Sequence, residues 1–153
     1  ASMADDGLIE IHRQHRSGQD KYTYFLLAIT ASVVAFSVQK TSGLKLVWPM
    51  LPLGFAVLLW GISFYFGCKS LIWVQTSIYA NYSLLQLHKG VHPEQPDHPQ
   101  MLAAAISGVR SAIESNIKNA QFYAEWQFRL LIAGSVLFLA WHILEMALLT
   151  YAP

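Results

Sequence analysis

Residues 130–149 read LLIAGSVLFLAWHILEMALL, and only His142 and Glu145 in this stretch carry ionisable side chains. At a helical rise of about 1.5 Å per residue the stretch is about 30 Å long, which matches the hydrocarbon core of a bilayer. Arg129 and Trp126 come just before it, where basic and aromatic side chains anchor a helix at the membrane interface. The stretch therefore predicts a transmembrane helix over residues 130–149.

Two further apolar stretches predict two more transmembrane helices. Residues 22–38 contain no charged side chain and are bracketed by Lys21 and Lys40, whose ammonium groups can reach the two interfaces. Residues 46–67 are also uncharged, and Pro49 in their opening turn is tolerated because amides of a first helical turn have no helical partner. The composition of the whole chain also favours membrane spans, since a chain with 54% hydrophobic and 12% charged residues is too apolar for a soluble domain.

The distribution of basic residues predicts the orientation of the chain. Eight of the ten lysines and arginines fall before the first predicted span or between the second and third, and two fall in the loop between the first and second. Because cytoplasmic loops are enriched in lysine and arginine, we expect the N-terminus and residues 68–128 in the cytoplasm and the C-terminus outside an inner (plasma) membrane. The eight are Arg13, Arg16, Lys21, Lys69, Lys89, Arg110, Lys118 and Arg129, and the two are Lys40 and Lys45.

Apolar residues continue at helical spacing through residues 68–128, beyond the predicted membrane spans. Prolines and a glycine interrupt the pattern over 88–98, and Pro99 is a favourable first residue for a new helix. We expect two antiparallel helices whose apolar stripes face each other. The first stripe comprises Leu71, Val74, Ile78, Tyr82 and Leu85, and the second comprises Leu102, Ile106, Val109, Ile113, Ile117, Ala120 and Ala124.

These observations predict an all-α integral membrane protein with three transmembrane helices. Spans two and three extend into a cytoplasmic antiparallel helical hairpin that covers residues 68–128. Residues 1–21 form a cytoplasmic N-terminal segment, within which residues 4–20 are expected to make a short amphipathic helix at the inner membrane surface.

His142 and Glu145 are candidate functional residues because ionisable groups inside a membrane span are costly. They lie at i and i+3, on one helix face, about 18 and 22 Å from the inner end of the span. One interpretation is a proton-sensitive or cation-attracting site that lines a water-filled path. The alternative is an outer-interface carboxylate, about 6 Å from the end of the span, beside a histidine bonded to a neighbouring helix.

Three hydroxyl side chains, Thr23, Thr30 and Ser37, recur every seven residues along the first span and share a polar line. In a pore this line would face water. Hydroxyls in membrane helices also bond to their own backbone or to a neighbouring helix, which is the alternative.

No pattern in the sequence predicts a metal, a cofactor or an enzyme. His88, His92 and His98 surround the central turn, but their spacing matches no strong ligand pattern. Neither a catalytic triad nor a phosphate-binding glycine loop is recognisable, so we expect no enzymatic reaction. The formal net charge of +1 argues against a nucleic-acid partner.

Small residues spaced four apart in the first span predict helix association, and hence a homo-oligomer. Ala28 with Ser32 and Ala31 with Ala35 allow close backbone approach in lipid. Together with the polar candidates, they favour a small homo-oligomeric channel or pore-forming effector. The alternative is a membrane-anchored scaffold or signalling subunit whose cytoplasmic hairpin docks a partner protein.

Overall fold

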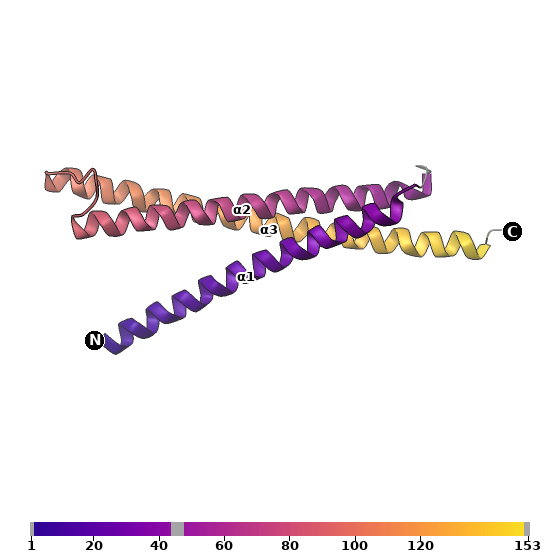
Figure 1. Ribbon diagram of the computed structural model, residues 1–153, viewed down its shortest axis with the longest axis horizontal. Helices are drawn as coiled ribbons and strands as arrows, with labels where there is room; N and C mark the ends of the chain where they lie inside the picture. The colour runs from indigo at the N-terminus through magenta and orange to yellow at the C-terminus, as the bar shows by residue number, and fades with distance from the viewer. Residues whose placement is uncertain (1, 44–47, 152–153) are drawn as a thin grey trace. The chain divides into compact units, whose positions relative to one another are not determined.

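The chain is all-helical in the part that the structure describes, which confirms the all-α part of the prediction. The computed structural model describes the backbone of residues 2–43 and 48–151, with the side chains of 18, 21–43 and 48–150. Three long helices account for most of it: α1 (Ser2–Thr41), α2 (Leu51–Lys89) and α3 (Pro99–Tyr151), with a short 3-10 turn, η1 (Trp48–Met50), before α2 (Figure 1). The predicted start of the second span at residue 46 lies outside the described residues.

The turn between α2 and α3 follows from residues that end and begin helices. Gly90 has a positive φ of 70°, its amide donates to Leu87 O at 3.3 Å, and the Val91 amide donates to Gln86 O at 3.1 Å. This is a Schellman cap, in which glycine supplies the left-handed conformation. Pro99 begins α3, as predicted from its position after the turn.

The N-terminal expectation is wrong in one respect. A separate short helix over residues 4–20 is not present, because α1 runs without interruption from Ser2 to Thr41. No proline falls in this range, and each of the two glycines, Gly7 and Gly18, costs an interior helical position only about 1 kcal/mol. The N-terminal segment and the first apolar stretch therefore belong to one 40-residue helix.

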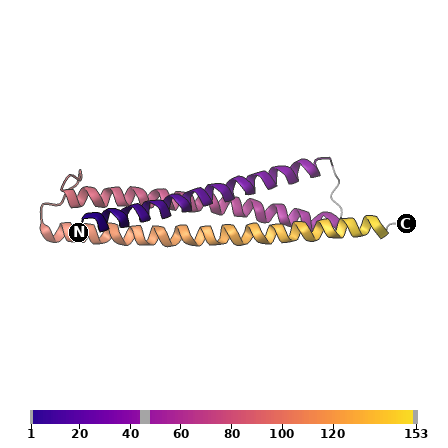
Figure 2. The ribbon, with the colours of Figure 1, turned by 90° about the horizontal axis from the view of Figure 1, so that it is seen from below.

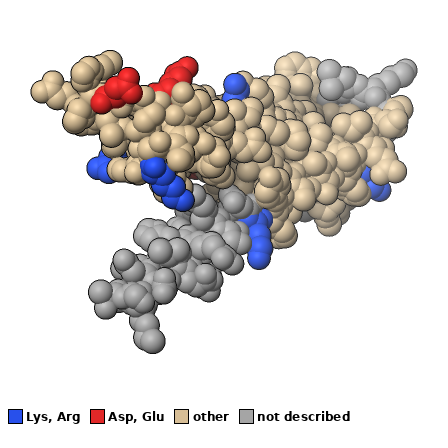
Figure 3. All heavy atoms as spheres, turned by 60° about the vertical axis from the view of Figure 1, so that its left-hand side comes forward, with Lys and Arg blue, Asp and Glu red and all other residues tan. Residues whose placement is uncertain are grey.

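Three helical stretches are long and apolar enough to cross a membrane: Lys21–Thr41, Trp48–Lys89 and Pro99–Thr150. Only 11% to 28% of the most apolar window in each is buried within the protein, so most of the large apolar side chains lie on the outside. Figure 3 shows charged side chains as separate patches on a surface that is mainly uncharged. A soluble bundle buries its apolar faces, whereas this exterior is compatible with lipid as the surrounding solvent.

The chain forms two compact units, and α2 and α3 contribute to both. Unit 1 comprises Ala1–Gly67 and Gln127–Pro153, and unit 2 comprises Cys68–Trp126. The core of unit 1 is built on Leu26, Trp60 and Leu131, one from each helix. The Trp60 indole N–H donates to Leu131 O at 3.3 Å, which satisfies the only polar atom of a side chain that is 1% exposed.

Unit 2 is held by a seam of small residues between its two helices, which run side by side in opposite directions (Figures 1 and 2). Ser70 and Ser77 of α2 and Ala120 of α3 are buried there, and Ser70 Oγ donates to Ala120 O at 2.9 Å. Small side chains let two helix backbones approach closely, so a polar hydroxyl reaches the carbonyl of the neighbouring helix. Leu87 is the one large side chain of unit 2 that is fully buried in the described structure.

The predicted apolar stripe of α2 is therefore rotated away from α3 over part of its length. Leu71 and Val74 are half-buried, but Ile78, Tyr82 and Leu85 are 46%, 58% and 54% exposed. The expectation that these three residues face α3 is wrong, because the serines of the seam occupy that position. The stripe of α3 agrees better, since all of its members are buried or half-buried except Ile117.

Candidate functional site

The candidate site is a cavity of about 400 Å³ in unit 1, at the end where α1 stops and α2 begins. All three helices and η1 supply its walls. From α1 come Phe36, Ser37, Lys40 and Thr41, from η1 and α2 come Met50 and Leu53, and from α3 come Phe138, Trp141, His142 and Glu145. Cavities of this size accommodate small ligands or parts of larger ones.

The cavity is apolar at one end and charged at the other. Glu145 follows Phe138 by seven positions on α3, which is about 10 Å along the helix. Because α1 and α3 both run toward the charged end and α2 runs away from it, Leu53 and Phe138 line the apolar end, and Phe36 lies between the two ends with its ring facing Lys40. Lys40, His142 and Glu145 line the other end.

Two of the polar groups in the wall are already satisfied within α1. Ser37 Oγ donates to Val33 O at 2.8 Å, and Thr41 Oγ1 donates to Ser37 O at 2.9 Å. Neither hydroxyl therefore has its proton left for a ligand. The chemistry of the cavity rests on Lys40, His142 and Glu145, with the Trp141 indole beside them.

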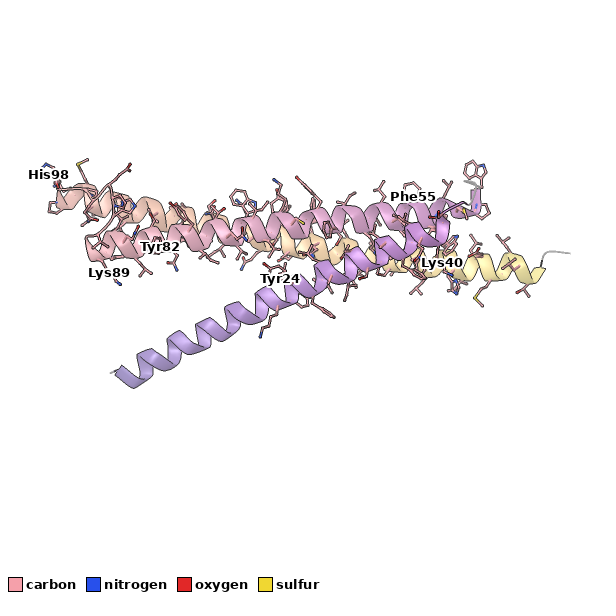
Figure 4. All side chains as sticks on the ribbon, viewed as in Figure 1. Tyr24, Lys40, Phe55, Tyr82, Lys89 and His98 are labelled. Carbon is pink, nitrogen blue, oxygen red and sulfur yellow. The ribbon has the colours of Figure 1, made fainter. Side chains whose placement is uncertain are left out.

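Lys40 lies in the last turn of α1 (Figure 4), where the helix dipole favours a positive charge. Its Nζ atom is 5.8 Å from the centroid of the Phe36 ring, within the range of a cation–π interaction. No ion pair within 4.0 Å joins Lys40 to Glu145, both of which the structure describes. The cavity thus presents a positive and a negative group that do not neutralise each other by direct contact.

The structure brings together the two candidates of the third span. His142 is exposed and Glu145 is half-buried, and both line the cavity, as their spacing at i and i+3 allows. The His142 ring lies 6.4 Å from the Trp141 ring, centroid to centroid. Sequence reasoning treated Lys40 only as an interfacial anchor, although it follows Ser37 by three residues and so shares a face with the polar line.

The polar line of the first span is placed inside unit 1. Thr30 is fully buried and Ser37 is 2% exposed, while Thr23 is half-buried. Thr30 Oγ1 donates to Leu26 O at 2.7 Å, the same pattern as Ser37 with Val33. In the single chain, both hydroxyls are thus bonded to their own helix, which is the alternative that the sequence left open.

Sequence reasoning missed a buried amide, Gln127 of α3. The side chain is 1% exposed, and neither its Nε2 nor its Oε1 has a hydrogen-bond partner. It packs where Gly67 leaves room, since a Cβ at that glycine would lie 2.5 Å from Gln127 Nε2. Ser63 Oγ donates to the Gln127 backbone oxygen at 2.7 Å. The available signal was its position seven residues after Ala120, on the buried face of the helix.

The central turn contains a Ser–His pair, but its geometry does not suit catalysis. Ser83 Oγ lies 3.0 Å from His92 Nε2, and the Glu94 amide donates to His92 Nδ1 at 3.1 Å. Because Nδ1 accepts a hydrogen bond, the neutral ring carries its proton on Nε2 and donates it to the serine. A general base for serine needs the opposite tautomer.

Metal ligands are not clustered in the described part of the chain, where no group of three His, Cys, Asp or Glu residues could hold an ion. The sequence-based expectations of no cofactor and no enzymatic reaction stay predictions. Comparison of the chain with protein-family models, curated proteins and solved structures gives no match.

Proposed function

We propose that this chain is a homo-oligomeric multi-pass membrane protein in which unit 2 is a cytoplasmic docking hairpin, and that its first partner is a second copy of the chain. Unit 1 would span an inner membrane with its three helices. The lysine and arginine count supports this orientation, since Lys69, Lys89, Arg110 and Lys118 all belong to unit 2.

The observation that carries the proposal is the exposed apolar face of α2 in unit 2. Ile78, Tyr82 and Leu85 lie at i, i+4 and i+7, and thus on one face of the helix. We call these three residues the α2 stripe; Figure 4 labels its central member, Tyr82. Large apolar groups repeated at this spacing in contact with water are the pattern of a helix that packs against a further helix.

The composition of the seam supports a second copy as the partner. Unit 2 has two helices and buries mainly small side chains between them, so its own seam supplies little apolar burial. Two hairpins that pair through their α2 stripes would form a four-helix bundle with a full apolar core. Arg110, Glu114 and Lys118 of α3 are exposed, and their charged side chains suit water. This favours the α2 stripe, rather than that face of α3, as the contact surface between two copies.

The test is the oligomeric state of the full chain in nanodiscs or mild detergent, measured by mass photometry and cross-linking. The double variant Ile78→Gln/Leu85→Gln is expected to weaken association by about 2–4 kcal/mol, since two apolar anchors are lost from the interface. Thr76→Gln is the matched control, because it places the same side chain on another face of α2, where Thr76 is exposed. An unchanged oligomer in the double variant, or a monomeric wild type, would contradict the proposal.

A channel is the second candidate, and the cavity of unit 1 is the observation in its favour. His142 and Glu145, which lie inside the predicted third span, line it together with Lys40, which lies just beyond the predicted first span. Ionisable groups at membrane depth mark ion paths in many membrane proteins. Flux across liposomes that contain the purified protein tests it. If no ion flux is detected at any pH or voltage, and Glu145→Gln leaves every measured activity of the protein intact, docking would be the only supported function.

A further inference from the structure

The cavity in unit 1 is apolar at one end and charged at the other, as a lipid molecule is. Its apolar end is walled by Leu53 and Phe138 and its charged end by Lys40 and Glu145, with the Phe36 ring between them. The charged end lies where α1 stops and α2 begins, which is an end of the predicted spans and thus near the membrane surface. A phospholipid in a bilayer is oriented in the same way, with its headgroup at the surface and its acyl chains toward the middle.

The apolar end suits an acyl chain because its walls offer no free hydrogen-bond donor and few acceptors to water. The Ser37 hydroxyl donates its proton within α1, and the remaining walls there are aromatic or aliphatic. Water bound in such a space would lack the two to four polar partners that it requires. A flexible hydrocarbon chain from the surrounding bilayer fills the same space without that cost.

The charged end distinguishes between headgroups. Lys40 supplies a positive charge held over the Phe36 ring, and Glu145 supplies a half-buried carboxylate, with no ion pair between these two described groups. A purely anionic headgroup would meet the carboxylate, and a purely cationic one would meet the lysine. A headgroup with both charges can place its phosphate at Lys40 and its ammonium group at Glu145. Donation of N–H bonds to the carboxylate requires a primary ammonium group rather than a quaternary one.

We propose that this cavity binds one phospholipid whose headgroup carries a phosphate and a primary ammonium group, as in a phosphatidylethanolamine. Its phosphate is held by Lys40, with His142 as a second donor, its ammonium group is held by Glu145, and an acyl chain lies against Phe36, Leu53 and Phe138. This inference rests on the proposed membrane position of unit 1 but not on the proposed docking of unit 2.

The test is native mass spectrometry of the full chain released from nanodiscs. The nanodiscs contain equal amounts of phosphatidylethanolamine, phosphatidylcholine and phosphatidylglycerol with the same acyl chains. Wild type is expected to retain phosphatidylethanolamine in preference to the other two lipids. Lys40→Gln and Glu145→Gln are each expected to lower that retention about tenfold, the effect of losing one charged hydrogen bond. Lys21→Gln is the control, because Lys21 is exposed near the opposite end of the first span and does not line the cavity.

Several results would overturn the proposal. Equal retention of the three lipids would remove the headgroup argument, and retention of phosphatidylglycerol that depends on Lys40 alone would show an anionic lipid site. If Lys21→Gln lowered phosphatidylethanolamine retention as much as the cavity variants do, positive charge near the membrane surface, and not the cavity, would control retention. Leu53→Trp, which fills the apolar end, should lower retention of every lipid, and no change there would place the lipid elsewhere.

Each result is read together with the oligomeric state of the same sample. An intact oligomer that retains no lipid contradicts only the lipid site. A monomeric wild type that retains phosphatidylethanolamine contradicts only the proposed docking of unit 2.

Discussion

The two units use the same pair of helices in different ways. In unit 1, a third helix packs against α2 and α3, so Leu26, Trp60 and Leu131 form a core. In unit 2, α2 and α3 meet mainly through serines and an alanine, and the large residues of the α2 stripe stay exposed. The difference teaches that close helix contact and apolar burial are separate requirements, and that unit 2 meets only the first of them within one chain.

The largest expected effect comes from emptying the core of unit 1. Trp60→Ala removes a side chain that is 1% exposed, together with its hydrogen bond to Leu131 O, and should lower the free energy of unfolding by about 3–5 kcal/mol. Tyr79→Ala in unit 2 removes a side chain that is 74% exposed and should change it by less than about 0.5 kcal/mol. Circular dichroism during titration with a denaturing detergent measures both, at a dilution that keeps the chain monomeric. Equal losses would mean that the two units do not differ in how they bury large side chains.

A pair of glycines gives a smaller effect of opposite sign in the two units. A Cβ at Gly134 would lie 2.6 Å from Trp60 Nε1, so Gly134→Ala forces Trp60 to shift and should cost about 1–3 kcal/mol. Gly108 has nothing within 4 Å of that position, so Gly108→Ala should stabilise α3 by about 0.5–1 kcal/mol through helix propensity alone. The same titration measures both variants. A stabilising Gly134→Ala would show that α2 and α3 are not in close contact at Trp60.

Much of the fold was predictable because it depends on local patterns. Apolar length predicted the three membrane-compatible helices, and Gly90 with Pro99 predicted the turn. The exposure of the α2 stripe was not predictable from the hydrophobicity of its residues. Such a prediction assumes that the largest apolar residues of a helix face the neighbouring helix. Ser70 and Ser77 turn inward instead, since their small size allows the helices to approach.

The candidate site was predictable only within one helix. His142 and Glu145 were linked by their spacing, which fixes a common face of α3 whatever surrounds it. Lys40 comes from α1, and no local pattern connects residues about one hundred positions apart. The cavity therefore needed the packing of three helices before its charged end could be recognised.

The smallest expected effect tests what the two units have in common. Ser63 of unit 1 donates to Gln127 O at 2.7 Å, and Ser70 of unit 2 donates to Ala120 O at 2.9 Å, so α2 makes the same kind of bond to α3 in each. Replacing either serine by alanine should cost about 0.5–1.5 kcal/mol, because a buried carbonyl loses a hydrogen bond while little volume changes.

The two serines lie seven residues apart, about 10 Å along the helix, so the costs of Ser63→Ala and Ser70→Ala should add in the double variant. Thr76→Ala is the control, since that exposed hydroxyl bonds only to Ile72 O of its own helix. If Ser63→Ala were costly and Ser70→Ala neutral, the close contact would belong to unit 1 alone. Unit 2 would then depend on its partner for helix contact as well as for apolar burial, because its own seam would contribute nothing measurable.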